Sequence, residues 1–66
     1  MNVLINGESR EVPDGLTVAG LVAHLGIHPG QVAIERNFEI LFRSKWESTL
    51  ILTNDRYEIV HMVGGG

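Results

Sequence analysis

One segment of this 66-residue sequence has the spacing of an amphipathic helix, and this feature constrains the fold most. Its apolar residues recur three and four positions apart, which places them on one helical face. They are Val18, Leu21, Val22 and Leu25. Thr17 offers an oxygen to the first free amides of the helix, whereas Gly26 and Pro29 stop it. The pattern predicts a helix of about nine residues.

Short extended runs lie on both sides of this helix. Before it, Met1, Val3 and Ile5 share one face of a strand. Asn6-Gly7 supplies the positive φ of a tight hairpin turn, and residues 10–12 form the returning strand. After the helix, extended segments are predicted at residues 32–35, 40–42, 49–52 and 57–63, with a helical turn or loop at residues 43–47. This order predicts an α+β fold in which a mixed sheet of about five strands carries one helix.

The last extended segment has two faces of different character. Side chains alternate across a strand, so Ile59 and Val60 point to opposite sides of the sheet. If Ile59 faces the helix, Val60 and Met62 face outward, whereas Val63, at the end of the strand, shares the face of Ile59. Exposed apolar side chains often mark interfaces, so we predict a partner-docking surface of Val60, Met62 and Val63. The alternative is that a neighbouring strand or loop covers them.

The composition argues against several classes of protein. The formal charge is −3 and only five residues are Lys or Arg, so no basic stripe is available for nucleic acid. No run approaches the ~20 apolar residues of a membrane span and no secretory signal is recognisable, so we expect a cytoplasmic protein. The absence of cysteine removes thiolate metal sites, disulfides and cysteine nucleophiles.

Few side chains in the body of the protein suggest a site. His24 and His28 are spaced like metal ligands on a helix, but Gly26 ends the helix between them. Without a third ligand we expect no metal site. We expect His61 to pack or to contact a partner, and Trp46 to cap a satellite apolar cluster. The acidic residues form no catalytic pair and no loop resembles a phosphate cradle, so we do not expect an enzyme.

Three glycines, Gly64, Gly65 and Gly66, end the sequence. We predict a folded domain at residues 1–63 and a flexible tail at residues 64–66. Glycine has no Cβ to crowd its carbonyl carbon, and three extended residues reach roughly 10 Å, enough to enter the active site of another protein. The alternative is that these glycines are a frayed linker, since chain ends are commonly disordered.

Three motifs together resemble one known family. They are Val32-Ala33-Ile34-Glu35-Arg36-Asn37, Arg43-Ser44-Lys45-Trp46-Glu47 and the ending from Asp55 to Gly66. The whole chain resembles the ThiS family of thiamin-pathway sulfur carriers, which implies the β-grasp fold found in ubiquitin and in MoaD carriers. Three positions differ from the commoner pattern of that family: Phe38 and Asn54 stand where turn glycines are common, and Leu41-Phe42 where proline often precedes the arginine. Phe38 suits a tight turn less well than glycine does.

The resemblance also implies a function. A ThiF-like adenylyltransferase would use ATP to adenylate the carboxylate of Gly66, and a sulfur donor such as a cysteine desulfurase system would supply the sulfur of a thiocarboxylate. A ThiG-like thiazole synthase would then consume that sulfur, and the chain itself would bind no cofactor. The alternatives are a MoaD-like carrier for molybdopterin synthesis, a non-covalent β-grasp interaction module and a ubiquitin-like protein tag.

Overall fold

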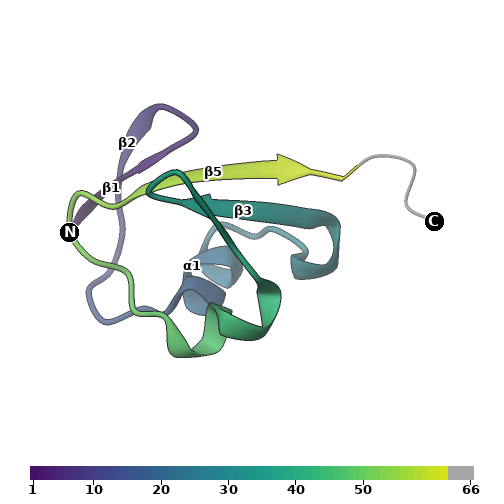
Figure 1. The fold of residues 1–66 in the computed structure, drawn as a ribbon. Coiled ribbons are helices and arrows are strands. Elements are labelled where there is room, and N and C mark those ends of the chain that lie inside the picture. The colour runs from purple at the N-terminus through teal and green to yellow at the C-terminus, as the bar shows by residue number, and fades with distance from the viewer. Residues whose placement is uncertain (63–66) are drawn as a thin grey trace.

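The fold is described for residues 1–62 of a computed structural model. It is a single five-stranded mixed sheet with one helix packed across one face (Figure 1). The elements are β1 (Asn2–Ile5), β2 (Glu8–Glu11), α1 (Val18–His24), β3 (Val32–Arg36), β4 (Glu39–Leu41) and β5 (Arg56–His61), with short 3-10 helices η1 (Pro29–Gln31) and η2 (Arg43–Ser48). The predicted α+β architecture is therefore confirmed, whereas Val63 and the glycines at 64–66 lie outside the described residues.

The last strand of the sequence lies in the middle of the sheet. The strand order is β2-β1-β5-β3-β4, and β5 runs parallel to β1 and antiparallel to β3. β2 and β4 complete the sheet as antiparallel partners of β1 and β3. β5 pairs with β1 at Arg56 and Tyr57 and with β3 from Tyr57 to His61, so the strand that leads to the carboxyl end is fixed to the body along its length.

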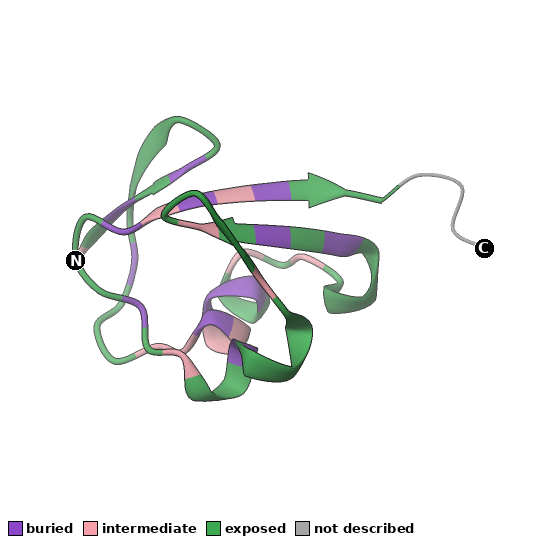
Figure 2. Ribbon diagram, in the orientation of Figure 1, coloured by how far each residue is buried: buried purple, intermediate pink, exposed green. Residues whose placement is uncertain are grey.

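One face of the sheet is buried against α1 and the other is exposed (Figure 2). Tyr57 and Ile59 of β5 are 0% and 6% exposed, so the prediction that Ile59 faces the helix is confirmed. The core consists of Val3, Ile5, Val12, Val18, Leu21, Val22, Val32, Ile34, Trp46, Ile51, Tyr57 and Ile59.

The prediction that Trp46 caps a satellite apolar cluster is wrong. η2 brings this ring into the main core, where its Nε1 donates to the Leu41 carbonyl at 3.1 Å.

The helix forms where its capping signals predict it. Thr17 is the N-cap, and its Oγ1 accepts a hydrogen bond from the Gly20 amide at 3.1 Å. Gly26 adopts φ +72°, and the Ile27 amide then donates to the Val22 carbonyl at 3.1 Å. The regular part covers seven residues, two fewer than predicted, because Thr17 and Leu25 serve as caps.

Most of the predicted strands differ from the observed ones at one end or both, and β5 begins one residue before the predicted segment 57–63 and ends before Met62. β2 begins two residues before the predicted segment 10–12, and β4 begins one residue before segment 40–42. Segment 49–52 joins no sheet and makes only an isolated bridge between Thr17 and Leu50. It crosses the helical layer instead, where the Thr49 carbonyl accepts from the first amide of α1 at 2.8 Å.

Two asparagine turns fasten β5 to its neighbours. Asn6 and Asn37 both have φ +51°, and each begins a tight hairpin turn, so the predicted Asn6-Gly7 turn is confirmed. The Asn6 side chain exchanges two hydrogen bonds with the backbone of Ile59, at 2.7 and 3.2 Å. The side-chain Oδ1 of Asn37 accepts a hydrogen bond from the backbone amide of Arg56 at 2.9 Å. The backbone amide of Asn37 donates to the backbone carbonyl of Arg56 at 2.7 Å. These bonds hold β5 at its start and at its middle.

Candidate functional site

The candidate site begins at the carboxyl end of β5 (Figure 1). His61 is paired with Val32 of β3. The next amide, that of Met62, donates to the carbonyl of Gln31 in η1 at 2.8 Å. The backbone is thus hydrogen-bonded as far as Met62, which fixes the position and direction from which the following residues start.

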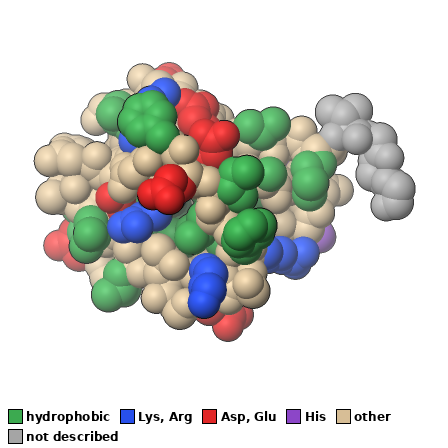
Figure 3. All heavy atoms as spheres, viewed as in Figure 1, with side chains coloured by type: hydrophobic (Ala, Val, Ile, Leu, Met, Phe, Trp, Pro, Cys, Tyr) green, Lys and Arg blue, Asp and Glu red, His purple; other side chains and the backbone are tan. Residues whose placement is uncertain are grey.

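The open face of the sheet at this end carries apolar side chains. Val60 and Met62 are 59% and 55% exposed, so their predicted outward orientation is confirmed. Val60 is opposite Ala33 of β3, and the exposed side chains of Ile40 and Phe42 lie beyond it on the β4 side. Figure 3 shows hydrophobic side chains spread over the visible side of the molecule, with acidic ones between them. We define Ala33, Ile40, Phe42, Val60 and Met62 as the open-face patch. The predicted third member of the docking surface, Val63, lies outside the described residues.

A shallow groove borders the open-face patch. Its volume is about 210 Å³, and Ala33, Phe42, Arg43 and Met62 are among the residues that line it. Pockets for small molecules usually occupy roughly 300–1,000 Å³, so this groove is better matched to one side chain of a partner protein. The lining is largely apolar, which favours an apolar side chain in that role.

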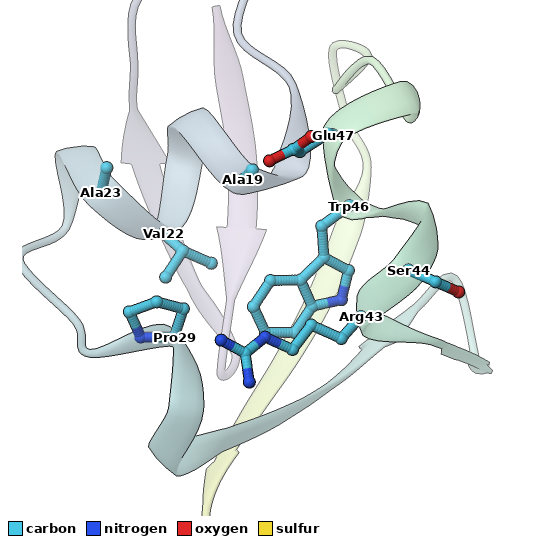
Figure 4. A pocket seen from close by; sticks show the side chains of 8 residues that line it. All are labelled: Ala19, Val22, Ala23, Pro29, Arg43, Ser44, Trp46 and Glu47. Carbon is cyan, nitrogen blue, oxygen red and sulfur yellow. The ribbon is translucent and has the colours of Figure 1, made fainter.

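A larger pocket of about 420 Å³ lies between α1 and η2. Figure 4 shows its lining: aliphatic groups from α1 and Pro29 face Trp46, and Arg43 extends past the indole ring toward Pro29. The charged residues of the lining are Arg43 and Glu47, and the only hydroxyl is that of Ser44. The polar groups of this lining therefore stand beside apolar walls, an arrangement that offers both charged and apolar binding contacts.

The histidines do not gather into a site. His24 and His61 are exposed, at the end of α1 and at the end of β5. His28 is also exposed, and its Nδ1 accepts from the Gly30 amide at 3.2 Å, which caps η1. Within residues 1–62 no three potential metal ligands lie together.

None of the helices within residues 1–62 is long and apolar enough to cross a membrane.

A buried polar cluster at the start of β5 was not predicted from the sequence. Asp55 is only 6% exposed, yet both of its carboxylate oxygens accept hydrogen bonds. The donors are Arg36 Nε at 3.1 Å, the Tyr57 hydroxyl at 2.8 Å, Asn37 Nδ2 at 3.1 Å and the Leu52 amide at 2.9 Å. The cluster joins the turn before β5 to β3, so it positions the strand that carries the candidate site.

The cluster shifts the ionisation of its members. Burial alone would raise the pKa of Asp55, but the hydrogen bonds from Leu52, Asn37 and Tyr57 and the charge of Arg36 together lower it. Burial and the neighbouring Asp55 carboxylate raise the pKa of the Tyr57 hydroxyl to about 12. Asp55 is therefore charged and Tyr57 neutral at physiological pH, the states in which the hydroxyl donates to the carboxylate.

Replacing Asp55 with alanine should destabilise the domain by about 3 kcal/mol, because Arg36 and Tyr57 would lose their buried acceptor. The matched control is Glu58→Ala, which breaks the half-exposed pair with Arg56 and should cost less than about 1 kcal/mol.

The contribution of Asp55 to the stability of the domain should depend on pH. Because the folded-state pKa of Asp55 is lowered, this contribution is complete above about pH 4 and is lost as the pH falls further. Urea unfolding at a series of pH values should show the difference between wild type and Asp55→Ala shrinking below that pH. A constant difference would contradict this account.

Comparison with known proteins identifies the family. The model of the ThiS family matches residues 3–66. The chain belongs to the ThiS family. This ThiS-family chain also superposes on the crystal structure of the thiamine biosynthesis protein ThiS from Geobacter metallireducens with a TM-score of 0.85, at 33% identity over 100% of both chains. The β-grasp fold implied by the sequence resemblance is thereby confirmed.

Two curated relatives are longer proteins. The ThiS-family chain is 39% identical to a thiazole synthase of Paramagnetospirillum magneticum and 36% identical to a thiazole synthase of Magnetococcus marinus. Each match includes 100% of this chain and 20% of the relative. The chain therefore spans one fifth of the length of these two relatives.

Proposed function

We propose that this chain is a sulfur carrier for thiazole formation in thiamine biosynthesis, and that Gly66 provides the acyl group that carries the sulfur. The observation that supports this proposal most is the family match, which extends through the three terminal glycines to residue 66. The similarity to proteins named thiazole synthase supports a ThiG-like synthase as the enzyme that consumes the sulfur. The chain would act as a co-substrate of its partners and not as a catalyst.

The proposed chemistry follows from the low reactivity of a carboxylate. Its negative charge repels nucleophiles and its oxygen is a poor leaving group, so the Gly66 carboxylate must first be activated. A ThiF-like adenylyltransferase would join it to AMP from ATP, with release of pyrophosphate. The terminal sulfur of a persulfide, supplied by a cysteine desulfurase system, would then attack the acyl carbon and displace AMP. Cleavage of the resulting acyl disulfide by a thiol reductant would leave the thiocarboxylate.

The described part of the fold suits this role. β5 pairs with β1 at its start and with β3 as far as His61, and the last bond of the described backbone is that of Met62. Four further residues can reach roughly 13 Å when extended, a length that can enter the active site of a partner. The proposed docking surface, which consists of the open-face patch together with Val63, would bind first the ThiF-like enzyme and then the synthase. ATP would bind to the activating enzyme and not to this chain.

The mass of the intact protein tests this proposal. After incubation with ATP, the ThiF-like enzyme and a persulfide donor, the chain should gain the mass produced by exchange of one oxygen for one sulfur. Fragmentation should place the change on Gly66. A reaction without ATP is the control and should leave the mass unchanged. No mass change in the complete reaction would refute the proposal, whereas a loaded chain that supplies only molybdopterin synthase would favour the MoaD-like alternative.

A further inference from the structure

Phe38 combines an unfavourable backbone conformation with an exposed aromatic ring. It is the second residue of the turn between β3 and β4 and has φ +72°, a region that side chains with a Cβ rarely adopt. Its side chain is 76% exposed, so the ring gains little from burial within the domain. Glycine would relieve the backbone at this position without loss of core packing. An unfavourable conformation that is not offset by burial of the ring suggests a function for the side chain.

The ring is held on the open face of the sheet. The guanidinium carbon of Arg56 lies 4.3 Å from the centre of the Phe38 ring, a cation–π contact. Arg56 in turn pairs with Glu58 at 3.1 Å. Arg56 and Glu58 flank the buried Tyr57 in β5, so their side chains lie on the opposite face of the sheet from Tyr57. This is the face on which Val60 and Met62 lie. Phe38 therefore belongs to the same surface as the open-face patch.

The ring and the end of β5 lie at opposite ends of that surface. Phe38 contacts Arg56 at the start of β5, and Met62 follows its last residue. Met62 lies six residue steps after Arg56, which corresponds to about 20 Å of extended chain. A standard protein interface covers about 800 Å² on each partner, or roughly 28 Å across, so a single partner can cover both ends.

We propose that Phe38 is a second anchor of the docking surface and that it inserts into an apolar pocket of the thiazole synthase, with polar groups around the pocket to meet Arg56 and Glu58. This inference rests on the proposed function. The synthase is the favoured occupant because two relatives that contain a segment similar to this chain are named thiazole synthases and are about five times as long. Two contacts about 20 Å apart fix the orientation of the carrier, whereas the patch near Met62 alone would leave it free to rotate.

Two substitutions at Phe38 separate binding from stability. Phe38→Ala removes the ring and keeps a Cβ at the positive φ, whereas Phe38→Gly removes the ring and relieves the backbone. Both should weaken binding to a purified thiazole synthase by about tenfold, the usual effect of losing an aromatic anchor. Phe38→Gly should raise the melting temperature by roughly 4 °C, and Phe38→Ala should not raise it. Leu50→Ala is the control, since Leu50 is 57% exposed but bridges to Thr17 on the helical side. It should leave synthase binding unchanged.

The outcomes also separate this inference from the proposed function. The unaltered chain is first tested for sulfur loading and for binding to the synthase, and failure of loading would reject the proposed function together with the role of Phe38. If the unaltered chain loads and binds, equal affinity of the Phe38 variants would reject the Phe38 anchor alone. Weakening of Phe38→Ala but not of Phe38→Gly would also overturn it, because the effect would then follow stability. Slower adenylation with unchanged synthase binding would assign the ring to the activating enzyme and contradict the proposal.

Discussion

Deletion of Gly66 should abolish sulfur loading and leave thermal unfolding unchanged. The shortened chain would still end in glycine, so the chemistry of its carboxyl group would be the same. Its acyl carbon, however, would end about 3.5 Å short of the position that the proposed adenylation requires. Misplacement of a reacting group by 1 Å can cost about 100-fold in rate, so we expect no detectable thiocarboxylate on the timescale of the wild-type reaction.

Gly66→Ala is the matched control for this deletion. It keeps the length of the chain and adds one methyl group beside the attacked carbonyl, so it should load slowly but measurably. Intact mass gives the extent of loading, and circular dichroism gives the melting temperature of each variant. Loading of the deletion variant at the wild-type rate would show that the reacting group is elsewhere. A lower melting temperature would show that Gly66 contributes to the fold.

Substitutions at Ile59 in β5 and at Met62, directly after β5, should produce opposite results. Ile59→Asp places an unpaired charge in the core and should cost about 5 kcal/mol, a large part of the roughly 3–10 kcal/mol expected for a domain of 66 residues. We therefore expect Ile59→Asp to be largely unfolded at 37 °C. Met62→Asp lies on the exposed face and should change stability by less than about 0.5 kcal/mol.

Met62→Asp should nevertheless impair function. A carboxylate in the open-face patch must lose water when a partner covers it, so binding should weaken by at least about tenfold. Calorimetry measures the stability of both variants, and surface plasmon resonance measures their binding to the activating enzyme and to the synthase. Equal binding of Met62→Asp and wild type would remove Met62 from the docking surface.

Much of the fold could be predicted because its signals are local. The cap at Thr17, the positive φ at Asn6-Gly7 and the alternation of Ile59 with Val60 each depend on neighbouring residues. The burial of Trp46 depends on contacts between segments distant in sequence, as does the exclusion of residues 49–52 from the sheet. Periodicity does not report such contacts, and these two expectations were wrong.

The candidate site could be predicted only in part. The outward orientation of Val60 and Met62 follows from the two-residue period of a strand, and the structure bears it out. The Asp55 cluster has no sequence signature, because its acceptor oxygens and their donors come together only when β3 and β5 pair. Phe38 had one signal, its place after a turn asparagine, but its contact with Arg56 on the open face depends on the register of the sheet.

An isotope experiment tests most directly whether the acyl group of Gly66 delivers the sulfur of the thiazole. The chain is loaded with 34S from a labelled persulfide, separated from the donor and mixed with the thiazole synthase and its small-molecule substrates. We predict that the thiazole contains 34S, at most one atom for each chain consumed, and that the chain returns to its unloaded mass. Thiazole without the label, or label retained on the chain while thiazole forms, would contradict the account.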